Sequence, residues 1–252
     1  MFHLNGQKAL VTGGSRGIGR ACALMLAQAG ADVAINYYQN RDAALEVKSK
    51  IEQGSTDCLI LQADLSQKEQ TESMVGQIKE SWGKLDILIN NAGIWTYGEM
   101  GCMDYQVWRE TIKINLDSVF LITNSVVPMM KKAHRGCIVN ISSTAAVRGE
   151  AFHSHYASSK GALVSLTKSL AVELAPYKIR VNCVAPGWVE TDMCSDVFKD
   201  ESYKSQIRDS IPLKRIPPPE DIAGPVVFLV SDYARHITGE VLNVNGGAVL
   251  CG

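Results

Sequence analysis

The sequence predicts a single α/β domain over residues 1–252, built on a doubly wound, seven-stranded parallel sheet with helices on both faces. Short, β-branched apolar runs alternate with helical patterns almost to the end of the chain, as expected when each strand returns through a helix. These runs are apolar almost throughout, which is typical of strands that are covered on both faces. No linker, repeat or low-complexity segment divides the chain, so one domain is the simplest organisation.

Each expected element follows from a local pattern. Strands are expected at residues 9–12, 32–37, 58–63, 85–90, 137–141, 179–185 and 241–244. Helices are expected from about residues 17, 42, 66, 105, 156 and 219, where apolar residues recur at every third or fourth position. Residues 188–219 are polar, carry a run of prolines at 217–219 and interrupt the alternation. We expect this segment to form a mobile lid.

Composition and charge narrow the class of protein. The formal net charge of −1, without a long basic run, gives no electrostatic reason to expect binding to nucleic acid or to a membrane surface. The polar start of the chain does not fit a signal peptide, and no apolar run reaches the ~18 residues of a membrane span. The seven cysteines are scattered without a Cys-x-x-Cys pair, which fits buried thiols in a reducing compartment. A soluble, cytoplasmic protein is therefore expected.

A glycine-rich turn, Gly13-Gly14-Ser15-Arg16-Gly17-Ile18-Gly19, follows the first expected strand. Glycine lets the backbone bend sharply and approach a ligand closely, and the helix behind the turn offers free N–H groups to a pyrophosphate. The spacing differs from the common G-x-G-x-x-G pattern, and an ordinary tight turn would also use glycine. Its place between the first strand and the first helix favours dinucleotide binding on a Rossmann-type sheet.

The end of the second strand bears on the choice of cofactor. An acidic residue there would bind the 2′-hydroxyl of NAD, but the strand ends in Tyr37, followed by Tyr38, without an acid. Arg16 in the glycine turn and Arg41 after the second strand could pair with a 2′-phosphate, although solvated surface arginines would look the same. We therefore expect NADP(H) in preference to NAD(H).

Two later strand ends add candidate contacts to the cofactor. Ser66 and Glu69 form a capping-box pattern, which would leave Asp64, next to Leu65, free at the sheet edge to contact an adenine amine. The segment Asn90-Asn91-Ala92-Gly93 follows the fourth strand, and its small residues would let a backbone pass close to a ribose. By itself this segment is a loop with a moderate turn signal.

The candidate catalytic residues follow the fifth strand. It ends at Ser142-Ser143, and the next helix opens near Tyr156, with Lys160 four residues further on the same face. A tyrosine titrates near ~10, and a neighbouring ammonium together with an oxidised nicotinamide would lower the pKa of Tyr156 and make it an acid–base group. Ser143 could donate a hydrogen bond to the reacting oxygen. The combination of Ser143, Tyr156 and Lys160 predicts that the protein transfers a hydride and a proton between a carbonyl and an alcohol.

Other uses of these residues fit less well. Hydrolysis by Ser143 would need a base such as His134, His153 or His155, but no G-x-S-x-G elbow surrounds the serine, and the glycine turn would have no role. The histidines lack the spacing of metal ligands, so no metal is expected. A non-catalytic NADP(H)-binding sensor on the same fold would be expected to have lost one of the three chemical groups, and all are present.

Together these motifs resemble the short-chain dehydrogenase/reductase family over essentially the whole chain. The step of thirteen residues from Ser143 to Tyr156 is the family's usual one, and it selects Ser143 over Ser142. The resemblance implies that Asn115 completes a catalytic tetrad by holding a water that relays protons to Lys160. From the residues alone, Asn115 is a polar position in an apolar helix, which is more often a structural kink.

The resemblance also implies nicotinamide contacts from Pro186-Gly187, Val189 and Thr191, with Thr191 holding the carboxamide. An arginine before the second glycine, as at Arg16, is similar to the NADP-preferring members. Family members are usually tetramers that pack through two long helices and the C-terminal strand, and residues 243–248 resemble that closing segment. A homotetramer is therefore expected.

Within the family the chain looks most like the 3-oxoacyl-[acyl-carrier-protein] reductases, with sugar and other alcohol dehydrogenases behind them. Such reductases dock an acidic carrier protein on basic residues, for which Lys131, Lys132 and Arg135 are candidates, although a charged helix end is commoner. Tyr177, beside Lys178, replaces the second docking arginine of that subfamily. The pocket positions are bulky and mixed, and they comprise Ile94, Trp95, Ala145, Arg148 and Trp188. They indicate a partly aromatic pocket for a small carbonyl or alcohol.

Overall fold

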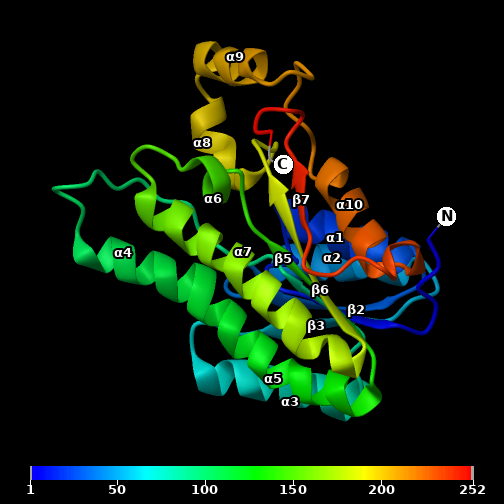
Figure 1. Cartoon of the computed structure of the whole chain (residues 1–252). Helices are drawn as coiled ribbons and strands as arrows, with labels where there is room; N and C mark the ends of the chain where they lie inside the picture. Colours follow the sequence, from blue (N-terminus) through cyan, green and yellow to red (C-terminus); the bar gives the residue numbers. More distant parts are fainter. Residues whose placement is uncertain (1, 251–252) are drawn as a thin grey trace.

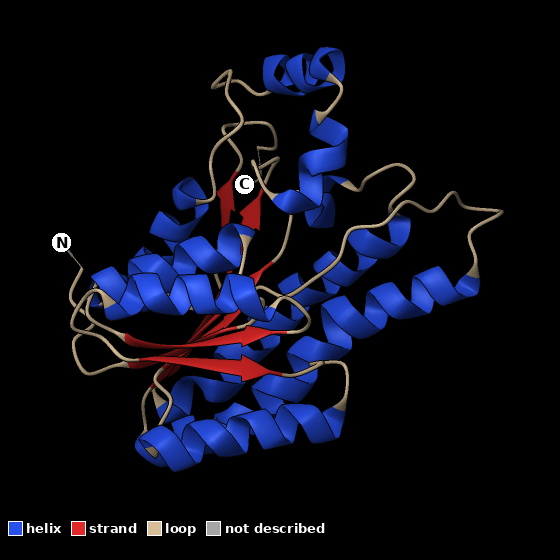
Figure 2. Ribbon diagram, turned by 180° about the vertical axis from the view of Figure 1, so that it is seen from behind, coloured by secondary structure: helices blue, strands red, loops and turns tan. Residues whose placement is uncertain are grey.

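The computed structural model describes residues 2–250 and contains one seven-stranded parallel sheet between two layers of helices (Figures 1 and 2). The strands are β1 (Lys8–Val11), β2 (Asp32–Tyr37), β3 (Cys58–Gln62), β4 (Ile87–Asn90), β5 (Gly136–Ile141), β6 (Ile179–Pro186) and β7 (Val241–Val244). They lie in the order β3-β2-β1-β4-β5-β6-β7, and every neighbouring pair is parallel. The fold class predicted from the sequence is confirmed, with small shifts at the strand ends.

The helices return the chain from each strand to the next. They are α1 (Gly17–Gln28), α2 (Arg41–Glu52), α3 (Lys68–Trp82), α4 (Tyr105–Ile112), α5 (Ser118–Ala133), α6 (Ala145–Arg148), α7 (Ser154–Leu174), α8 (Ser195–Phe198), α9 (Glu201–Ser210) and α10 (Glu220–Val230). In Figure 1, α3, α5 and α7 cover one face of the sheet, while α1, α2 and α10 cover the other.

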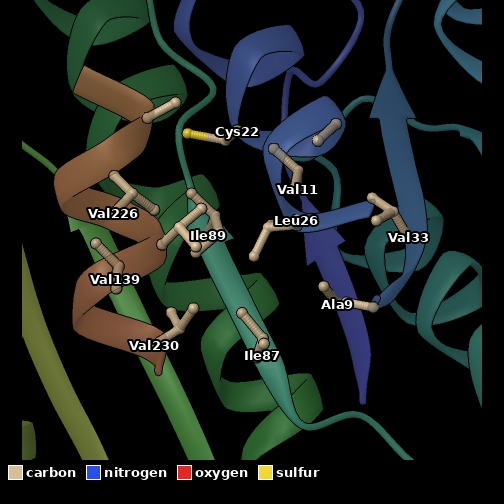
Figure 3. Packing of buried hydrophobic residues seen from close by; sticks show 14 of the residues in the cluster. Ala9, Val11, Cys22, Leu26, Val33, Ile87, Ile89, Val139, Val226 and Val230 are labelled. Carbon is tan, nitrogen blue, oxygen red and sulfur yellow. The ribbon is translucent and has the colours of Figure 1, made fainter. Parts of the chain in front are cut away.

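Alternate residues of each strand supply two separate cores. Ala9 and Val11 of β1 point towards α1 and α10, whereas Leu10 between them points towards α3, α5 and α7. Figure 3 shows the first core, in which Leu26 of α1 and Val226 of α10 lie against β1 and β4. Burying a valine or leucine side chain contributes about 1.5–3 kcal/mol. The sheet that carries the site is thus stabilised from both sides.

The start of α3 differs from the sequence-based prediction. The capping box at Ser66 and Glu69 does not form, because the helix begins at Lys68 after Gln67. Instead, the backbone N–H and the hydroxyl of Ser66 both donate to Oδ1 of Asp64, at 2.9 and 2.6 Å. An aspartate that bonds two residues ahead forms an Asx turn, which competes with capping by a following serine. One carboxylate oxygen of Asp64 therefore holds the turn after β3, and a contact of Asp64 with an adenine amine stays a prediction.

Two expected segments have more structure than their patterns predicted. The helix expected from residue 105 is interrupted by a π-helical segment, η1 (Lys113–Asp117), before it continues as α5. The stretch 188–219 is not irregular throughout, because it contains η3 (Asp192–Cys194), α8 and α9. These helices project beyond the carboxyl end of the sheet, at the top of Figure 1. That this segment moves as a lid stays a prediction.

The six cysteines within the described residues are free thiols. Those at 22, 58, 137 and 183 are buried, as expected, but Cys102 is exposed and Cys194 is half-buried. Cys251 lies outside the described residues. No helix in residues 2–250 is long and apolar enough to cross a membrane. Over the same residues, no cluster of His, Cys, Asp and Glu side chains is arranged to hold a metal ion.

Candidate active site

The strand order reverses between β1 and β4, which are neighbours in the sheet although two other strands separate them in the sequence. Ligands of open α/β sheets bind outside the carboxyl ends of the strands at such a reversal. The glycine turn, residues 13–19, follows β1, and the segment 91–93 follows β4. The topology therefore brings these two sequence motifs to one place.

Asn91 ties the two loops together. Its backbone N–H and that of Ala92 donate to the Thr12 hydroxyl, at 2.9 and 3.0 Å. Its side-chain amide donates to the carbonyl oxygens of Thr12 and Gly13, at 2.9 and 3.2 Å. The sequence of residues 90–93 predicted only a turn with small residues. The structure shows that Asn91 also fixes the shape of the glycine turn.

The glycine turn keeps its tight shape because its glycines lack side chains. A Cβ added at Gly19 would lie 2.3 Å from the Gly13 carbonyl oxygen and 2.5 Å from Nδ2 of Asn91. Gly13 and Gly17 adopt φ angles of +60° and +51°, in the left-handed region that favours glycine. Because α1 begins at Gly17, the unpaired N–H groups of its first turn face the space before it. This arrangement can hold a pyrophosphate.

A cavity of about 780 Å³, its open mouth included, lies beside the glycine turn. The residues predicted from the sequence that line it are Ile18, Asn91, Gly93, Ser143, Tyr156, Lys160, Pro186, Gly187, Val189 and Thr191. Thr191 also approaches the glycine turn, since a Cβ at Gly17 would lie 3.4 Å from its methyl carbon. The ends of β1, β4, β5 and β6 thus contribute to one cavity.

The remaining predicted residues lie outside the lining of this cavity. They are Gly13, Ser15, Arg16, Gly17, Gly19, Tyr37, Asp64, Leu65, Ala92 and Asn115. Of the expected pocket positions, Trp95, Arg148 and Trp188 line the cavity, whereas Ile94 and Ala145 do not. Tyr37 ends β2 and Leu65 follows β3, so both belong to the half of the sheet edge away from Tyr156, and both are buried. Arg16 is exposed on the turn. A dinucleotide could therefore extend from β3 across β1 to the cavity.

Tyr156 and Lys160 lie one turn apart near the start of α7 and are 8% and 5% exposed. The Lys160 ammonium is 5.8 Å from the centre of the Tyr156 ring, and it donates to the carbonyl oxygen of Ile141 at 2.8 Å. The two serines after β5 differ in their contacts. Both line the cavity, but Ser142 is buried and its hydroxyl donates to the Lys160 carbonyl at 2.8 Å. Ser143 is therefore the serine that is available to a ligand.

Burial dominates the pKa values of this pair. It raises the pKa of Tyr156 well above its ordinary value, while the Ser143 hydroxyl acts in the opposite direction and the charge of Glu150 adds to the increase. Burial also lowers the pKa of Lys160 to about 8. In this structure burial is the main cause of the raised pKa of Tyr156; that the ammonium together with a bound, oxidised nicotinamide lowers it stays a prediction. Without a ligand, Tyr156 is a protonated acid at neutral pH.

Asn115 lies within the π-helical segment η1 and is fully buried. Its Oδ1 accepts from the Ile94 N–H at 2.8 Å, and its Nδ2 donates to the Ile94 carbonyl at 2.9 Å and to the Ser159 hydroxyl at 3.1 Å. A Cβ at Gly93 would lie 3.1 Å from Oδ1 of Asn115 and 3.4 Å from Nζ of Lys160. Asn115 therefore holds the loop after β4 against α7, close to Lys160. Single π-helical turns are frequent at functional sites.

A buried chain of amides and hydroxyls supports the site from below, and the sequence analysis missed it. Asn90 of β4 donates to Oδ1 of Asn140 on β5 at 2.8 Å and to the hydroxyl of Thr123 at 3.1 Å. Asn140 in turn donates to the Thr167 hydroxyl on α7 at 2.8 Å. The available signal was an asparagine near the end of each apolar strand. These hydrogen bonds join β4 and β5 to α5 and α7 below the site.

Aromatic side chains contribute to the wall of the cavity. Trp95 and His153 stack with their ring centres 4.3 Å apart and their planes 5° from parallel. Trp95 also meets Trp188 edge to face, with centres 5.9 Å apart, and Phe198 of α8 lies 6.0 Å behind Trp188. The backbone N–H of Gly98 donates to the carbonyl of residue 152 at 2.8 Å, which fastens the loop after β4 to the start of α7.

Comparison with known proteins agrees with this site. Residues 13–249 match a family model described as enoyl-(acyl carrier protein) reductase. A 3-oxoacyl-[acyl-carrier-protein] reductase of Staphylococcus aureus is 40% identical over 241 residues, which cover 96% of this chain and 97% of that protein. An L-rhamnose 1-dehydrogenase (NAD(P)(+)) of a Sphingomonas species is 37% identical over 245 residues, covering 97% and 96%. A crystal structure assigned to the short-chain alcohol dehydrogenases, from Sinorhizobium meliloti, superposes with a TM-score of 0.94 at 36% identity and 98% coverage of both chains.

The chain belongs to the short-chain dehydrogenase/reductase family. It is an oxidoreductase that acts on CH–OH groups and their carbonyl counterparts with a nicotinamide cofactor. Within the family it is close in sequence to the 3-oxoacyl-[acyl-carrier-protein] reductases, of which a second one, from Synechocystis, is 37% identical over 251 residues. The prediction of a nicotinamide-dependent oxidoreductase is confirmed.

Proposed function

We propose that the protein interconverts a ketone and a secondary alcohol with NADP(H), and that a 3-oxoacyl thioester is its substrate. The observation that carries the reaction is that Ser143, Tyr156 and Lys160 line a single cavity next to the glycine turn. The choice of substrate is supported by the full-length relatives that are named 3-oxoacyl-[acyl-carrier-protein] reductases. A cytoplasmic location fits such a role.

The residues at the carboxyl edge fit a nicotinamide dinucleotide, because α1 begins at Gly17 and the unpaired N–H groups of its first turn can bind a pyrophosphate. When bound, the nicotinamide supplies or accepts the hydride. The residues proposed to hold the cofactor are Gly13, Ser15, Arg16, Gly17, Ile18, Gly19, Tyr37, Asp64, Leu65, Asn91, Ala92, Gly93, Tyr156, Lys160, Pro186, Gly187, Val189 and Thr191. Arg16 is exposed on the turn and Arg41 begins α2, so both can reach a 2′-phosphate, which favours NADP(H).

The protein's own groups would handle the proton. Tyr156 donates its proton to the carbonyl oxygen during reduction, and its raised pKa keeps that proton in place beforehand. The Ser143 hydroxyl stabilises alkoxide character on the same oxygen through a hydrogen bond. Lys160 replaces the proton on Tyr156, and its pKa of about 8 suits the exchange near neutral pH. Asn115 is the fourth member: it holds the loop beside Lys160 and would position a relaying water.

A sugar or related polyol is the second candidate substrate. Arg148 and Glu150 line the cavity together with the two tryptophans, so hydrogen-bonding groups and flat apolar surfaces occur side by side. The L-rhamnose dehydrogenase relative supports this alternative. The two candidates differ in the group that flanks the carbonyl, so one substrate panel separates them.

Docking of a carrier protein and tetramer formation belong to the same proposal. Of the basic residues expected to meet a carrier, Lys131 lies over the Tyr177 ring at 4.6 Å, and Arg135 is 4.0 Å from the carboxylate of Asp86. Lys132 is exposed beside them, and the acidic carrier would meet a small basic patch.

Phe120 on α5 and Val172 on α7 are 56% and 78% exposed, which fits packing of these long helices against a second copy.

The experiment is a panel of carbonyl compounds assayed by loss of NADPH absorbance. It includes acetoacetyl thioesters on coenzyme A and on acyl-carrier protein, simple ketones, and sugar lactones assayed alongside the corresponding sugars in the oxidative direction. We expect the highest kcat/KM for the thioesters. A higher value for sugars would replace the first candidate by the second. No turnover of any compound, together with tight NADPH binding, would contradict the proposed reaction.

A further inference from the structure

Four aromatic side chains at the cavity contact one another in a row, and we call them the aromatic gate: His153, Trp95, Trp188 and Phe198. Two of them, Trp95 and Trp188, line the cavity itself. They come from different loops, since Trp95 follows β4 and Trp188 follows β6. In the sheet, β5 lies between these two strands, and Ser143 follows β5. The two indoles therefore meet across the position where a substrate carbonyl would approach Ser143.

Each indole is held by a second aromatic ring. Trp95 is stacked on His153 with planes 5° from parallel, and Trp188 is backed by Phe198 with ring centres 6.0 Å apart. His153 is in turn 3.8 Å from the carboxylate of Glu150. The pairing of Gly98 with the backbone near His153 fixes the loop that carries Trp95. The edge-to-face contact of the indoles is consequently braced from both sides rather than being a chance meeting of mobile side chains.

We propose that the aromatic gate limits the length of the substrate's acyl chain, so that the enzyme prefers the acetoacetyl thioester over longer 3-oxoacyl thioesters. This inference rests on the proposed function. A carbonyl held by Ser143 and Tyr156 has two substituents, and the thioester arm must point to the open mouth to reach its carrier. The alkyl arm then points into the cavity, where the Trp95–Trp188 contact closes the path. A longer chain has to separate the two half-buried rings before it can bind.

The size of the effect follows from how strongly a closed apolar pocket discriminates chain length. One added methylene in such a pocket changes kcat/KM by roughly 10-fold or more. We expect kcat/KM of the wild type to fall by about 10-fold or more from the acetoacetyl to the 3-oxooctanoyl thioester. In Trp95→Ala and in Trp188→Ala the profile flattens, because the long substrates gain while the short one loses packing against the ring.

The test measures kcat/KM with NADPH for acetoacetyl, 3-oxohexanoyl, 3-oxooctanoyl and 3-oxodecanoyl thioesters. Wild type is compared with Trp95→Ala, Trp188→Ala and the conservative Trp95→Phe, which keeps a stacked ring and should keep the preference. Trp82→Ala is the matched control: this tryptophan ends α3 and lies over Lys8, at the opposite end of the sheet, so its loss should leave the profile unchanged.

The possible results distinguish a failure of the aromatic-gate proposal from a failure of the proposed function. If the wild type reduces the whole series equally well, or if both alanine variants keep the wild-type profile, the gate is wrong and the reaction stands. If no thioester is reduced, the proposed substrate is wrong and the gate falls with it. Should Trp95→Ala not fold, the Trp188→Ala and Trp95→Phe profiles, taken with their thermal unfolding curves, decide the question.

Discussion

The ammonium of Lys160 lies 5.8 Å from the centre of the Tyr156 ring, yet it donates its hydrogen bond to the carbonyl oxygen of Ile141. The lysine is thus anchored to the end of β5 rather than to the phenol. Its charge sits beside Tyr156 without engaging the hydroxyl, which stays available to a substrate in the cavity. The anchor also explains how two adjacent buried polar groups keep a fixed geometry.

Replacement of Tyr156 by phenylalanine removes the proposed acid but keeps the ring. We expect turnover to fall by about 10²-fold or more, the usual contribution of a general acid or base, while NADPH binding is largely kept. Steady-state rates and fluorescence titration of NADPH measure the two quantities. Near-normal turnover in this variant would contradict the role given to Tyr156.

The low pKa of Lys160 makes stability depend on pH. Burial lowers this pKa from 10.5 to about 8, so between these values the unfolded chain binds a proton that the folded chain does not, and stability rises with pH. The difference in free energy of unfolding between the wild type and Lys160→Met should grow in favour of the wild type by about 2–3 kcal/mol from pH ~8 to pH ~10.

Urea unfolding at a series of pH values measures this difference. Above pH ~10 the raised pKa of Tyr156 acts in the opposite direction, because the unfolded chain then loses the phenolic proton first. Lys168→Met, an exposed position on the same helix, serves as the control and should show no such trend. A difference that stays constant across the range would mean that Lys160 is not desolvated in the folded protein.

Substitution of Glu150 tests how a neighbouring charge affects the pKa of Tyr156. Burial is the main cause of the raised pKa of Tyr156, and the negative charge of Glu150 adds to it. Glu150→Gln should therefore lower the pKa of Tyr156. In alcohol oxidation Tyr156 acts as the base, so the rise of kcat/KM with pH should begin at lower pH. The exposed substitution Glu69→Gln should leave the pH profile where it is.

Arg16 tests the choice of cofactor. If its guanidinium pairs with the 2′-phosphate, Arg16→Ala should weaken NADPH binding about 10-fold and leave NADH binding unchanged. Arg20→Ala is the matched control, because Arg20 lies on the following turn of α1 and pairs with Glu46 at 3.6 Å. If Arg16→Ala weakened the binding of NADPH and NADH equally, so that the ratio of their affinities did not change, Arg16 would not be the cause of a preference for NADP(H).

Two glycines should respond to alanine in opposite ways. Gly19→Ala drives a Cβ to 2.3 Å from the Gly13 carbonyl, so we expect a loss of about 1–3 kcal/mol in stability and of cofactor binding. Gly76 lies inside α3 with no atom within 4 Å of an added Cβ, so Gly76→Ala should gain about 0.5–1 kcal/mol. Chemical unfolding with and without NADPH checks both. A neutral Gly19→Ala would mean that the turn can relax.

The parts of the site that depend on short-range patterns could be predicted from the sequence. Tyr156 and Lys160 share a helix face because of their spacing, and the glycine turn is recognisable from its place after a strand. The choice between Ser142 and Ser143 required the family's spacing, and the structure supplies the physical reason, since the Ser142 hydroxyl is bonded to the backbone of Lys160.

Local patterns were insufficient where two of them compete or where distant segments meet. Asp64 and Ser66 suit either a capping box or an Asx turn, and only the packed loop after β3 decides between them. The role of Asn115 depends on Ile94, which a different strand brings to it. The contact between Trp95 and Trp188 depends on β5 lying between β4 and β6, an order that hydrophobic periodicity does not reveal.

The two indoles stand on loops beyond the strand ends, outside both cores and apart from the groups proposed to move the proton. A duplicated gene of this type could therefore drift to a new substrate by exchanging Trp95 or Trp188, with little risk to folding and none to the Tyr156–Lys160 spacing. Because the loops that carry the two tryptophans are separate from the sheet and its catalytic residues, single substitutions in these loops can change substrate specificity.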